Sequence, residues 1–303
     1  MYSIHQIFRL CALVVIAQLW ANTTQAQVAP VQNQFYLNPY IYNPAWVGSN
    51  DQNQLFLGVK KQWVGVEGAP TIATLTYEHA MEDNPASMGV QVVNISEGPI
   101  NTLAARVTAG YRLETGLDSY LYFGMSLGLV HNAFNANALD AANDPLVAEQ
   151  NAHSISFDGG FGFGYESNGL RMGLALPRFT APRPFVKNND GKDPYSPWDY
   201  MIGSLSYTFE PDLDWEFTPA FLYHMQKGFN NQWELGLTAT YQKTLNLGTI
   251  YRQNNGLTVL AGFSLSENLS LNYMYSFSSP TAKLPNDSHE LVIRLAMGRK
   301  GRR

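Results

Sequence analysis

Apolar and polar side chains alternate with a period of two along most of this chain. Near the carboxyl terminus, one face of a segment carries Leu269, Leu271, Tyr273, Tyr275 and Phe277. The positions between them are Ser270, Asn272, Met274 and Ser276. Successive side chains of a β-strand point to opposite faces, so the pattern predicts strands with one apolar face and one polar or small face. Residues 153–165, 232–241 and 257–266 alternate in the same way.

The alternation predicts about fourteen strands in all. We expect them near residues 55–61, 71–79, 88–95, 101–112, 119–131, 153–165, 170–177, 199–209, 215–225, 232–241, 244–253, 257–266, 269–277 and 288–297. Most are about 9–11 residues long, which is the length that a tilted strand needs to cross a bilayer.

The connections between these segments differ in length according to their order. The long connections 132–152, 178–198 and 278–287 follow the fifth, seventh and thirteenth segments, whereas even-numbered connections such as 166–169 are short. In a meandering sheet all odd-numbered connections open on one side, and outer-membrane barrels combine long external loops with short periplasmic turns. A soluble β-sandwich does not explain this difference.

The sequence therefore predicts an all-β fold, a transmembrane antiparallel β-barrel of about 14 strands with long extracellular loops and short periplasmic turns. We expect the barrel to occupy residues 55–298. An even number of strands places both ends of the barrel in the periplasm. A short basic tail, residues 299–303, follows it.

Composition agrees with a barrel in lipid. Charged residues make up 14% of the chain, against about 25% in ordinary soluble domains. Aromatic residues reach 13% and gather near the predicted strand ends, where such barrels carry their aromatic girdles. No apolar run after Ala26 approaches the roughly 18 residues of a transmembrane helix. The net charge of −5 gives no indication of a nucleic-acid partner.

Residues 1–26 have the layout of a secretory signal peptide. Arg9 precedes a short apolar core at residues 10–17, and Thr24-Gln25-Ala26 places small residues at positions −3 and −1 of a cleavage site. The alternative, a membrane anchor, is disfavoured because the apolar run is too short to cross the bilayer. Cleavage after Ala26 removes Cys11 and leaves a mature chain without cysteine, and hence without a disulfide or a thiol catalyst.

Residues 27–54 precede the first predicted strand and are rich in Asn, Gln, Tyr and Pro. We expect an irregular pre-barrel segment that lies in the periplasm or plugs the lumen. Two Asn-Pro steps, Asn38-Pro39 and Asn43-Pro44, predict two breaks from extended chain into turns. The simplest reading of these steps is a pair of turns before the barrel.

No catalytic or metal-binding pattern stands out. The histidines after the signal are His79, His131, His153, His224 and His289, and none is spaced for metal binding. Ser288-His289-Glu290 cannot form a triad, because neighbouring strand residues face opposite ways. Residues 160–164 alternate glycine with phenylalanine, which indicates a strand with small residues facing a crowded lumen. We expect no enzyme, no cofactor and no metal.

Several motifs make the chain resemble the PorP/SprF family of outer-membrane proteins of the type IX secretion system. The resemblance covers nearly the whole chain after the signal. The pre-barrel motif residues are Asn38, Pro39, Asn43, Pro44, Ala45 and Gly48. The first hairpin contributes Trp63, Gly65, Gly68, Ala69 and Pro70, and the last strand contributes Ser288, His289 and Glu290.

The resemblance implies a non-enzymatic barrel that serves secretion. It would partner a large surface cargo protein with a type B C-terminal sorting domain, including adhesins of gliding bacteria, and capture, export or anchor it. Some family members are also linked to periplasmic secretion-ring or peptidoglycan-binding components. The remaining partner is outer-membrane lipid, and the protein would reach the outer membrane through its cleaved signal peptide.

Loops on a rigid scaffold are where binding residues concentrate. The candidate cargo contacts in the two longest external loops are Asp140, Asp144, Phe179, Phe185, Tyr195 and Trp198. The alternative is that these loops only fold into the barrel mouth. The alternative function is an outer-membrane diffusion channel or small-solute transporter, since a barrel of about fourteen strands can enclose a lumen. The pre-barrel segment argues against an open pore if it fills that lumen.

Overall fold

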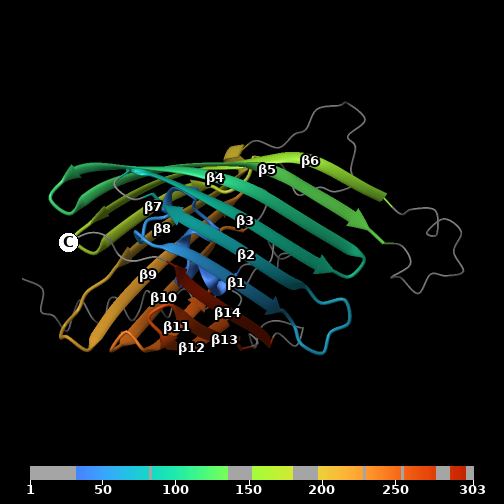
Figure 1. Cartoon of the computed structure of the whole chain (residues 1–303). Coiled ribbons are helices and arrows are strands. Elements are labelled where there is room, and N and C mark those ends of the chain that lie inside the picture. The colour runs from blue at the N-terminus through green and yellow to red at the C-terminus, as the bar shows by residue number, and fades with distance from the viewer. Residues whose placement is uncertain are drawn as a thin grey trace, which may run out of the picture.

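A computed structural model describes residues 32–81, 84–135, 152–179, 197–227, 230–253, 256–277 and 287–297. Fourteen antiparallel strands close into a barrel in which each strand pairs with its neighbours in sequence (Figure 1). The strands are β1 (Asn53–Lys61), β2 (Thr71–Ala80), β3 (Ala86–Glu97), β4 (Ile100–Gly116), β5 (Ser119–Phe134), β6 (Ala152–Ser167), β7 (Leu170–Leu176), β8 (Tyr200–Tyr207), β9 (Trp215–Gln226), β10 (Gln232–Tyr241), β11 (Leu245–Arg252), β12 (Gly256–Ser266), β13 (Leu269–Ser276) and β14 (Ser288–Met297).

The first and last strands close the barrel. β1 pairs antiparallel with β14, from Asn53 opposite Met297 to Lys61 opposite His289. Closure leaves no open sheet edge, so the backbone groups of the wall are satisfied within the protein, as a hydrocarbon surrounding demands. The predicted antiparallel barrel of fourteen strands is confirmed.

Strand length varies more than the sequence predicts. β4 has 17 residues, and β5 and β6 have 16 each, whereas β7 has only 7. The three long strands form a side of the barrel that extends beyond its neighbours (Figure 1). The expected range for β4, residues 101–112, was too short at its end, because pairing with β5 continues as far as Gly116 opposite Ser119.

The two faces of each strand differ as the alternation predicts. On β13, Leu271 and Tyr273 point outward and are each 41% exposed, whereas Met274 is fully buried inside. On β6, Phe161 and Phe163 point outward between inward-facing glycines. The outer surface therefore carries the apolar and aromatic side chains that a lipid-facing barrel wall requires.

The short connections lie at one end of the barrel. β6 and β7 are joined by Asn168-Gly169, both with positive φ (48° and 83°), which suits a two-residue hairpin turn. β12 and β13 are joined by Glu267-Asn268. We call this end the periplasmic mouth, because short turns face the periplasm in outer-membrane barrels. The opposite end, where the connections after β5, β7 and β13 begin, is the outer mouth.

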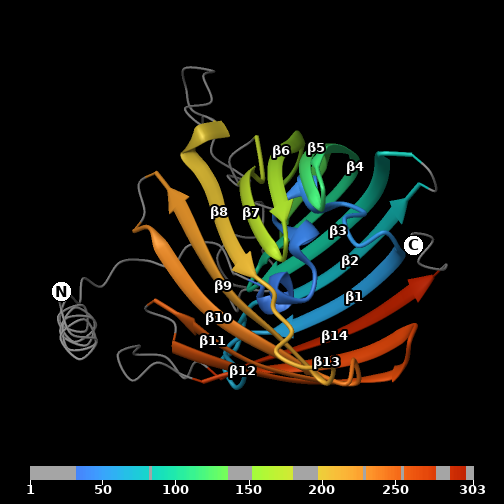
Figure 2. The same cartoon turned by 90° about the vertical axis from the view of Figure 1, so that its left-hand side faces the viewer.

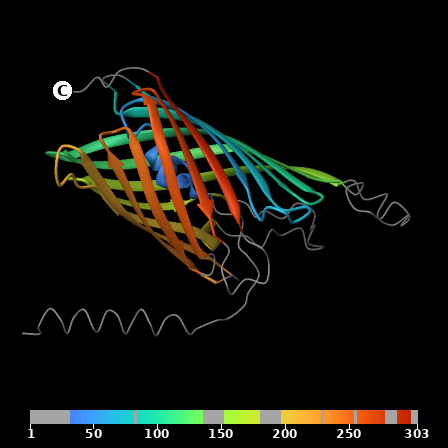
Figure 3. The same ribbon diagram turned by 90° about the horizontal axis from the view of Figure 1, so that it is seen from below.

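No helix among the described residues is long and apolar enough to cross a membrane. The described helices are short 3-10 turns: η1 (Asn33–Tyr36), η2 (Pro39–Ile41), η3 (Pro44–Trp46) and η5 (Pro197–Asp199). The first three precede β1 and lie inside the ring of strands (Figure 2). A view from below shows the same segment enclosed by the barrel wall (Figure 3).

Candidate functional site

Residues 32–52 occupy the barrel lumen, and we call this segment the plug (Figure 2). Three of its asparagines are as buried as its apolar side chains: Asn33 has no exposed surface, and Asn38 and Asn43 are 1% and 3% exposed. A buried polar group is costly unless it is hydrogen-bonded. The contacts between the plug and the wall are therefore the centre of the candidate site.

The two Asn-Pro steps build the turns of the plug. The side-chain oxygen Oδ1 of Asn38 accepts from the backbone N–H of Tyr40 at 3.2 Å, and Oδ1 of Asn43 accepts from that of Ala45 at 2.9 Å. Each asparagine thus caps the helix that follows, and proline takes the first helical position, where no N–H is needed. The predicted turns are confirmed at both steps.

The same two asparagines also fasten the plug to the wall. The amide nitrogen Nδ2 of Asn38 donates to Oγ1 of Thr76 on β2 at 2.7 Å. Nδ2 of Asn43 donates to the carbonyl of Phe163 on β6 at 3.1 Å. Asparagine offers an acceptor and two donors on one short side chain, so a single residue can cap a turn and contact the wall. Serine or aspartate at either position supplies only the cap.

The beginning of the plug is held by Glu290 of β14. Its carboxylate oxygens accept from the backbone N–H groups of Asn33 at 3.0 Å and Gln34 at 2.9 Å. Lys60 Nζ lies 4.0 Å from the same carboxylate, and both side chains are buried. The neighbouring His289 points outward, where it contacts Tyr273. Of the two neighbouring motif residues His289 and Glu290, only Glu290 contacts the plug.

A buried charged cluster holds the next part of the plug. Glu234 on β10 accepts from Arg252 at 3.0 Å, lies 3.0 Å from Nε2 of His224, and accepts from the hydroxyl of Tyr36 at 3.3 Å. Arg252 also donates to Oδ1 of Asn33 at 2.8 Å. A buried carboxylate and guanidinium are tolerated because each satisfies the other.

The last part of the plug is held by a second set of polar contacts. The N–H of Gly48 donates to Glu78 at 2.8 Å, and the hydroxyl of Ser87 donates to the carbonyl of Val47 at 2.7 Å. Asp51 forms an ion pair with Arg112 at 2.8 Å. The contacts again reach backbone groups of the plug as well as side chains.

The plug crosses the lumen from one mouth to the other. Asn33 contacts Ser276 and Arg252, which are the last residues of β13 and β11 at the outer mouth. Val47 contacts Ser87 near the start of β3, at the periplasmic mouth, and β1 begins there at Asn53. The chain therefore runs through the barrel towards the periplasm before the first strand begins. The barrel itself begins and ends at the periplasmic mouth, whereas Gln32 is at the opposite end of the plug, towards the outer mouth.

Glycines on the inner wall provide the space for the plug. A Cβ at Gly164 would lie 2.9 Å from the Trp46 ring, and one at Gly89 would lie 2.6 Å from Cγ2 of Val47. Such distances are shorter than packed carbon atoms allow. The alternation of glycine and phenylalanine therefore places Gly162 and Gly164 against the plug, and Phe161 and Phe163 against lipid.

Apolar contacts complete the packing. Tyr40, Ala45, Trp46 and Val47 form a buried cluster with Tyr122 of β5. A second cluster joins Phe35 and Ile41 of the plug to Leu222 of β9. Full burial of such a side chain stabilises by about 1.5–3 kcal/mol. The plug is thus packed on several sides of the wall, and it is not a loose extension.

The motif residues of the first hairpin lie outside the lumen, in the connection between β1 and β2 at the outer mouth. Trp63, Gly65 and Gly68 all have positive φ, at 49°, 93° and 72°. The carbonyls of Pro70 and Gly68 accept from Gln62 and Gly98, and Ala69 is buried. Ser288 accepts from the N–H of Trp63 at 3.3 Å. These residues shape a loop and its junction with β14.

The candidate cargo contacts are only partly within the described residues. Trp198, in η5 at the outer mouth, is 66% exposed. Phe179 donates its N–H to the buried carboxylate of Asp158 at 3.0 Å, which ties the start of its loop to the wall. Asp140, Asp144, Phe185 and Tyr195 lie outside the described residues, so this docking surface stays a prediction.

Most of the wall residues that bind the plug belong to no motif in the sequence. The inward-facing charged residues Glu78, Glu234 and Arg252 belong to strands whose neighbouring residues face lipid. In an alternating strand, a charged residue at an inward-facing position indicates a contact inside the lumen. The position of these residues in the alternation could therefore have identified them. Within the described part of the chain, no three or more His, Cys, Asp or Glu side chains come together as a metal site would require.

The fold and its filled lumen define a plugged β-barrel of the outer-membrane type. Among solved structures, the chain is similar to the P. putida toluene transporter TodX, with a TM-score of 0.52 and 12% identity over 86% of this chain and 94% of that one. It is also similar to the Acinetobacter baumannii outer membrane protein Omp33, with a TM-score of 0.50 and 8% identity over 81% and 98%. At these identities the likeness shows the fold alone.

The sequence itself identifies the family. The family model for the type IX secretion system membrane protein PorP/SprF matches residues 24–295. The chain belongs to this family, and it is an outer-membrane β-barrel component of type IX secretion. No curated protein matches the sequence at a significant level.

Proposed function

We propose that this barrel captures, exports or anchors a large cell-surface protein that carries a type B C-terminal sorting domain, and that it does so without enzymatic chemistry. The observation that carries the proposal is the plug. Membership of a type IX secretion family supplies the setting, and a lumen filled by a packed polypeptide favours a role in handling proteins over free diffusion of solutes.

Several contacts of the wall reach the backbone of the plug. Glu290 accepts from two backbone N–H groups, Gln91 donates to the carbonyl of Ile41 at 3.0 Å, and Ser87 donates to the carbonyl of Val47. Contacts to backbone groups are available to any extended polypeptide. The inner wall is thus chemically suited to hold a protein chain, which supports a role with protein partners.

The docking surface for the cargo would be the outer mouth. Cargo of this kind resides on the cell surface, and the connections that follow β5, β7 and β13 all open on that side. Trp198 offers an exposed aromatic side chain there, and exposed aromatic residues are frequent anchors in protein interfaces. We expect the cargo to contact Trp198 together with the loop residues named above.

The second candidate function is a channel. Its first support is that TodX is described as a toluene transporter, and CymD, similar at a TM-score of 0.50, as a monoaromatic hydrocarbon channel. A polar cavity of about 470 Å³ also remains beside the plug. Against this reading, the plug crosses the whole lumen and is packed into glycine-lined space.

Affinity purification of the tagged barrel from native membranes tests the proposal. We expect one or a few large surface proteins with a type B sorting domain to copurify. A Trp198→Ala variant should recover less of them, whereas Trp215→Ala, an aromatic change at the start of β9 at the periplasmic mouth, should recover the same amount. Recovery of the barrel without any large surface protein, under conditions that preserve other membrane complexes, would contradict the proposal.

A further inference from the structure

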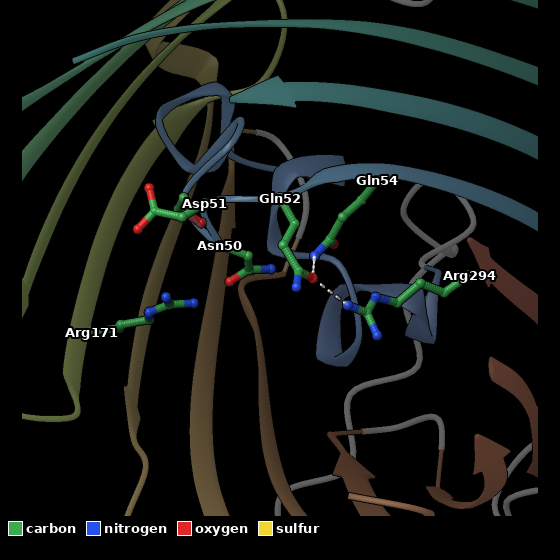
Figure 4. A pocket seen from close by; sticks show the side chains of 7 residues that line it. Asn50, Asp51, Gln52, Gln54, Arg171 and Arg294 are labelled. Carbon is green, nitrogen blue, oxygen red and sulfur yellow. Dashed lines mark hydrogen bonds between the residues drawn. The ribbon is translucent and has the colours of Figure 1, made fainter. Parts of the chain in front are cut away.

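A polar pocket of about 470 Å³ lies at the periplasmic mouth, where the plug meets β1 (Figure 4). Its wall combines Asn50 and Gln52 from the end of the plug with Gln54 of β1, Arg171 of β7 and Arg294 of β14. This volume falls within the range of about 300–1,000 Å³ that is usual for ligand sites. The pocket is therefore large enough to bind a short segment of another molecule.

Arg294 is the cation of the pocket that has no carboxylate of the described residues within ion-pair distance. Its Nη2 donates to Oε1 of Gln52 at 3.1 Å (Figure 4). It takes part in none of the ion pairs found within the described part of the chain. A guanidinium carries five N–H donors in a planar fork that suits a carboxylate or a phosphate. Arg294 can therefore receive an anionic group of a ligand.

The other charges of the pocket are already compensated. Arg171 forms an ion pair with Glu166 at 3.0 Å and stacks over the ring of Trp46, with 5.5 Å from the guanidinium carbon to the ring centroid. Asp51 is paired with Arg112 at 2.8 Å. Glu78, the cross-strand partner of Gln54, acts electrostatically on Arg294 from beyond ion-pair distance, and its carboxylate accepts from the backbone N–H of Gly48. Arg294 is thus the pocket cation that no described carboxylate contacts directly.

The buried side chain of Gln54 lacks a hydrogen-bond donor. The residue is 2% exposed, and its Oε1 is buried without a hydrogen-bond partner in the described part of the protein. Its Nε2 has one long contact, 3.5 Å to Oε1 of Gln52. A buried acceptor without a donor raises the free energy of the folded protein, because the acceptor has given up its hydrogen bonds to water. A ligand that brings an N–H group to Gln54 recovers this free energy.

We propose that the pocket binds an acidic peptide segment that enters from the periplasm, with a side-chain carboxylate on Arg294 and a backbone N–H on Gln54. A peptide carries both groups close together, whereas inorganic phosphate offers no N–H group. The closed wall separates the pocket from the bilayer, so a lipid headgroup has no lateral path to it. This proposal concerns the periplasmic mouth and does not rest on cargo docking at the outer mouth.

Calorimetric titration of the full-length, detergent-purified barrel tests the site. The probe is a capped tetrapeptide, acetyl-Ala-Glu-Ala-Ala-amide, and its isosteric partner contains Gln in place of Glu. We expect the Glu peptide to bind, and the Gln peptide to bind at least tenfold more weakly, since a hydrogen bond to a charged group is stronger than one to a neutral group. Arg294→Gln should weaken the binding of the Glu peptide to a similar extent. Gln54→Met should also weaken its binding.

The matched control is Arg178→Gln, the same change in an arginine that stacks on Tyr200 outside this pocket. It should leave binding unchanged, and every variant should keep the heat-dependent gel shift of a folded barrel. Three results would each overturn the proposal: no binding of the Glu peptide, equal binding to Arg294→Gln, or binding of inorganic phosphate as tight as that of the peptide. The last would define a simple anion site.

Discussion

At the scale of single residues, the plug depends on side chains that make two contacts at once. Asn43 caps a turn with its oxygen and contacts β6 with its nitrogen, and Glu290 serves two backbone N–H groups. The Asn-Pro sequence predicts the turns, because both the cap and the proline act locally. The wall contacts depend on which strands surround the segment, and no local pattern encodes that.

Substitutions at Asn43 separate these two contacts. Asn43→Ser keeps a capping oxygen but cannot reach the carbonyl of Phe163, whereas Asn43→Ala loses both contacts. We expect the alanine variant to destabilise the packed plug by about 1–3 kcal/mol and the serine variant by about half of that. Limited proteolysis of the plug in the purified barrel measures the difference. Equal protease resistance of the three proteins would show that neither contact holds the plug.

A pair of glycine substitutions tests the packing of the plug. Gly164→Ala places a methyl group 2.9 Å from the Trp46 ring, whereas Gly203→Ala meets no atom within 4 Å. Overpacking of this kind costs about 1–3 kcal/mol, so Gly164→Ala should expose Trp46 to quenchers and Gly203→Ala should not. Identical quenching in the two variants would mean that the plug is not seated against β6.

At the scale of elements, the strands follow from the sequence far better than the path of the plug does. The period-two alternation located all fourteen strands, because burial on one face and lipid on the other repeat at every second residue. The extra length of β4 to β6 escaped prediction, since their ends are set by pairing with each other. The plug has no periodicity, and its course through the lumen depends on glycines and charges that lie on distant strands.

Glu290→Gln tests how the beginning of the plug is held. The change turns one of two acceptor oxygens into a donor that faces a backbone N–H, and it removes the counter-charge of Lys60. We expect the fraction of barrels with a protease-sensitive plug to rise about tenfold or more. His289→Gln, at the neighbouring outward position, is the control and should leave the plug protected. A Glu290→Gln plug as resistant as the wild type would refute this role.

At the scale of the whole molecule, a closed barrel with a packed lumen should not conduct ions freely. We expect the intact protein to be silent in a planar bilayer and a variant lacking residues 32–50 to give steady pores. Val47→Cys combined with Gly89→Cys offers a disulfide lock between the plug and β3, because the side chain of Val47 lies against the inner face of the sheet at Gly89. If deletion of the plug opens no pore, or if the intact protein conducts steadily, the plug does not seal the barrel.

The disulfide-locked variant also distinguishes a barrel that handles proteins from a barrel that transports solutes. The predicted mature chain has no cysteine, so oxidation joins only this pair. If the barrel served solutes by releasing its plug, locking would abolish uptake, and reduction would restore it. We expect solute uptake to be the same in the oxidised and reduced forms, as for a barrel that serves proteins.

The most direct measurement is the surface proteome of a strain that lacks this gene, recorded beside its uptake of sugars and antibiotics. We expect one or a few large proteins with a type B sorting domain to disappear from the surface, while uptake stays unchanged. Complementation with the wild-type gene should restore them, and complementation with Trp198→Ala should restore them only in part. An unchanged surface proteome together with reduced uptake would contradict the secretion function and leave the family membership as a description of the fold.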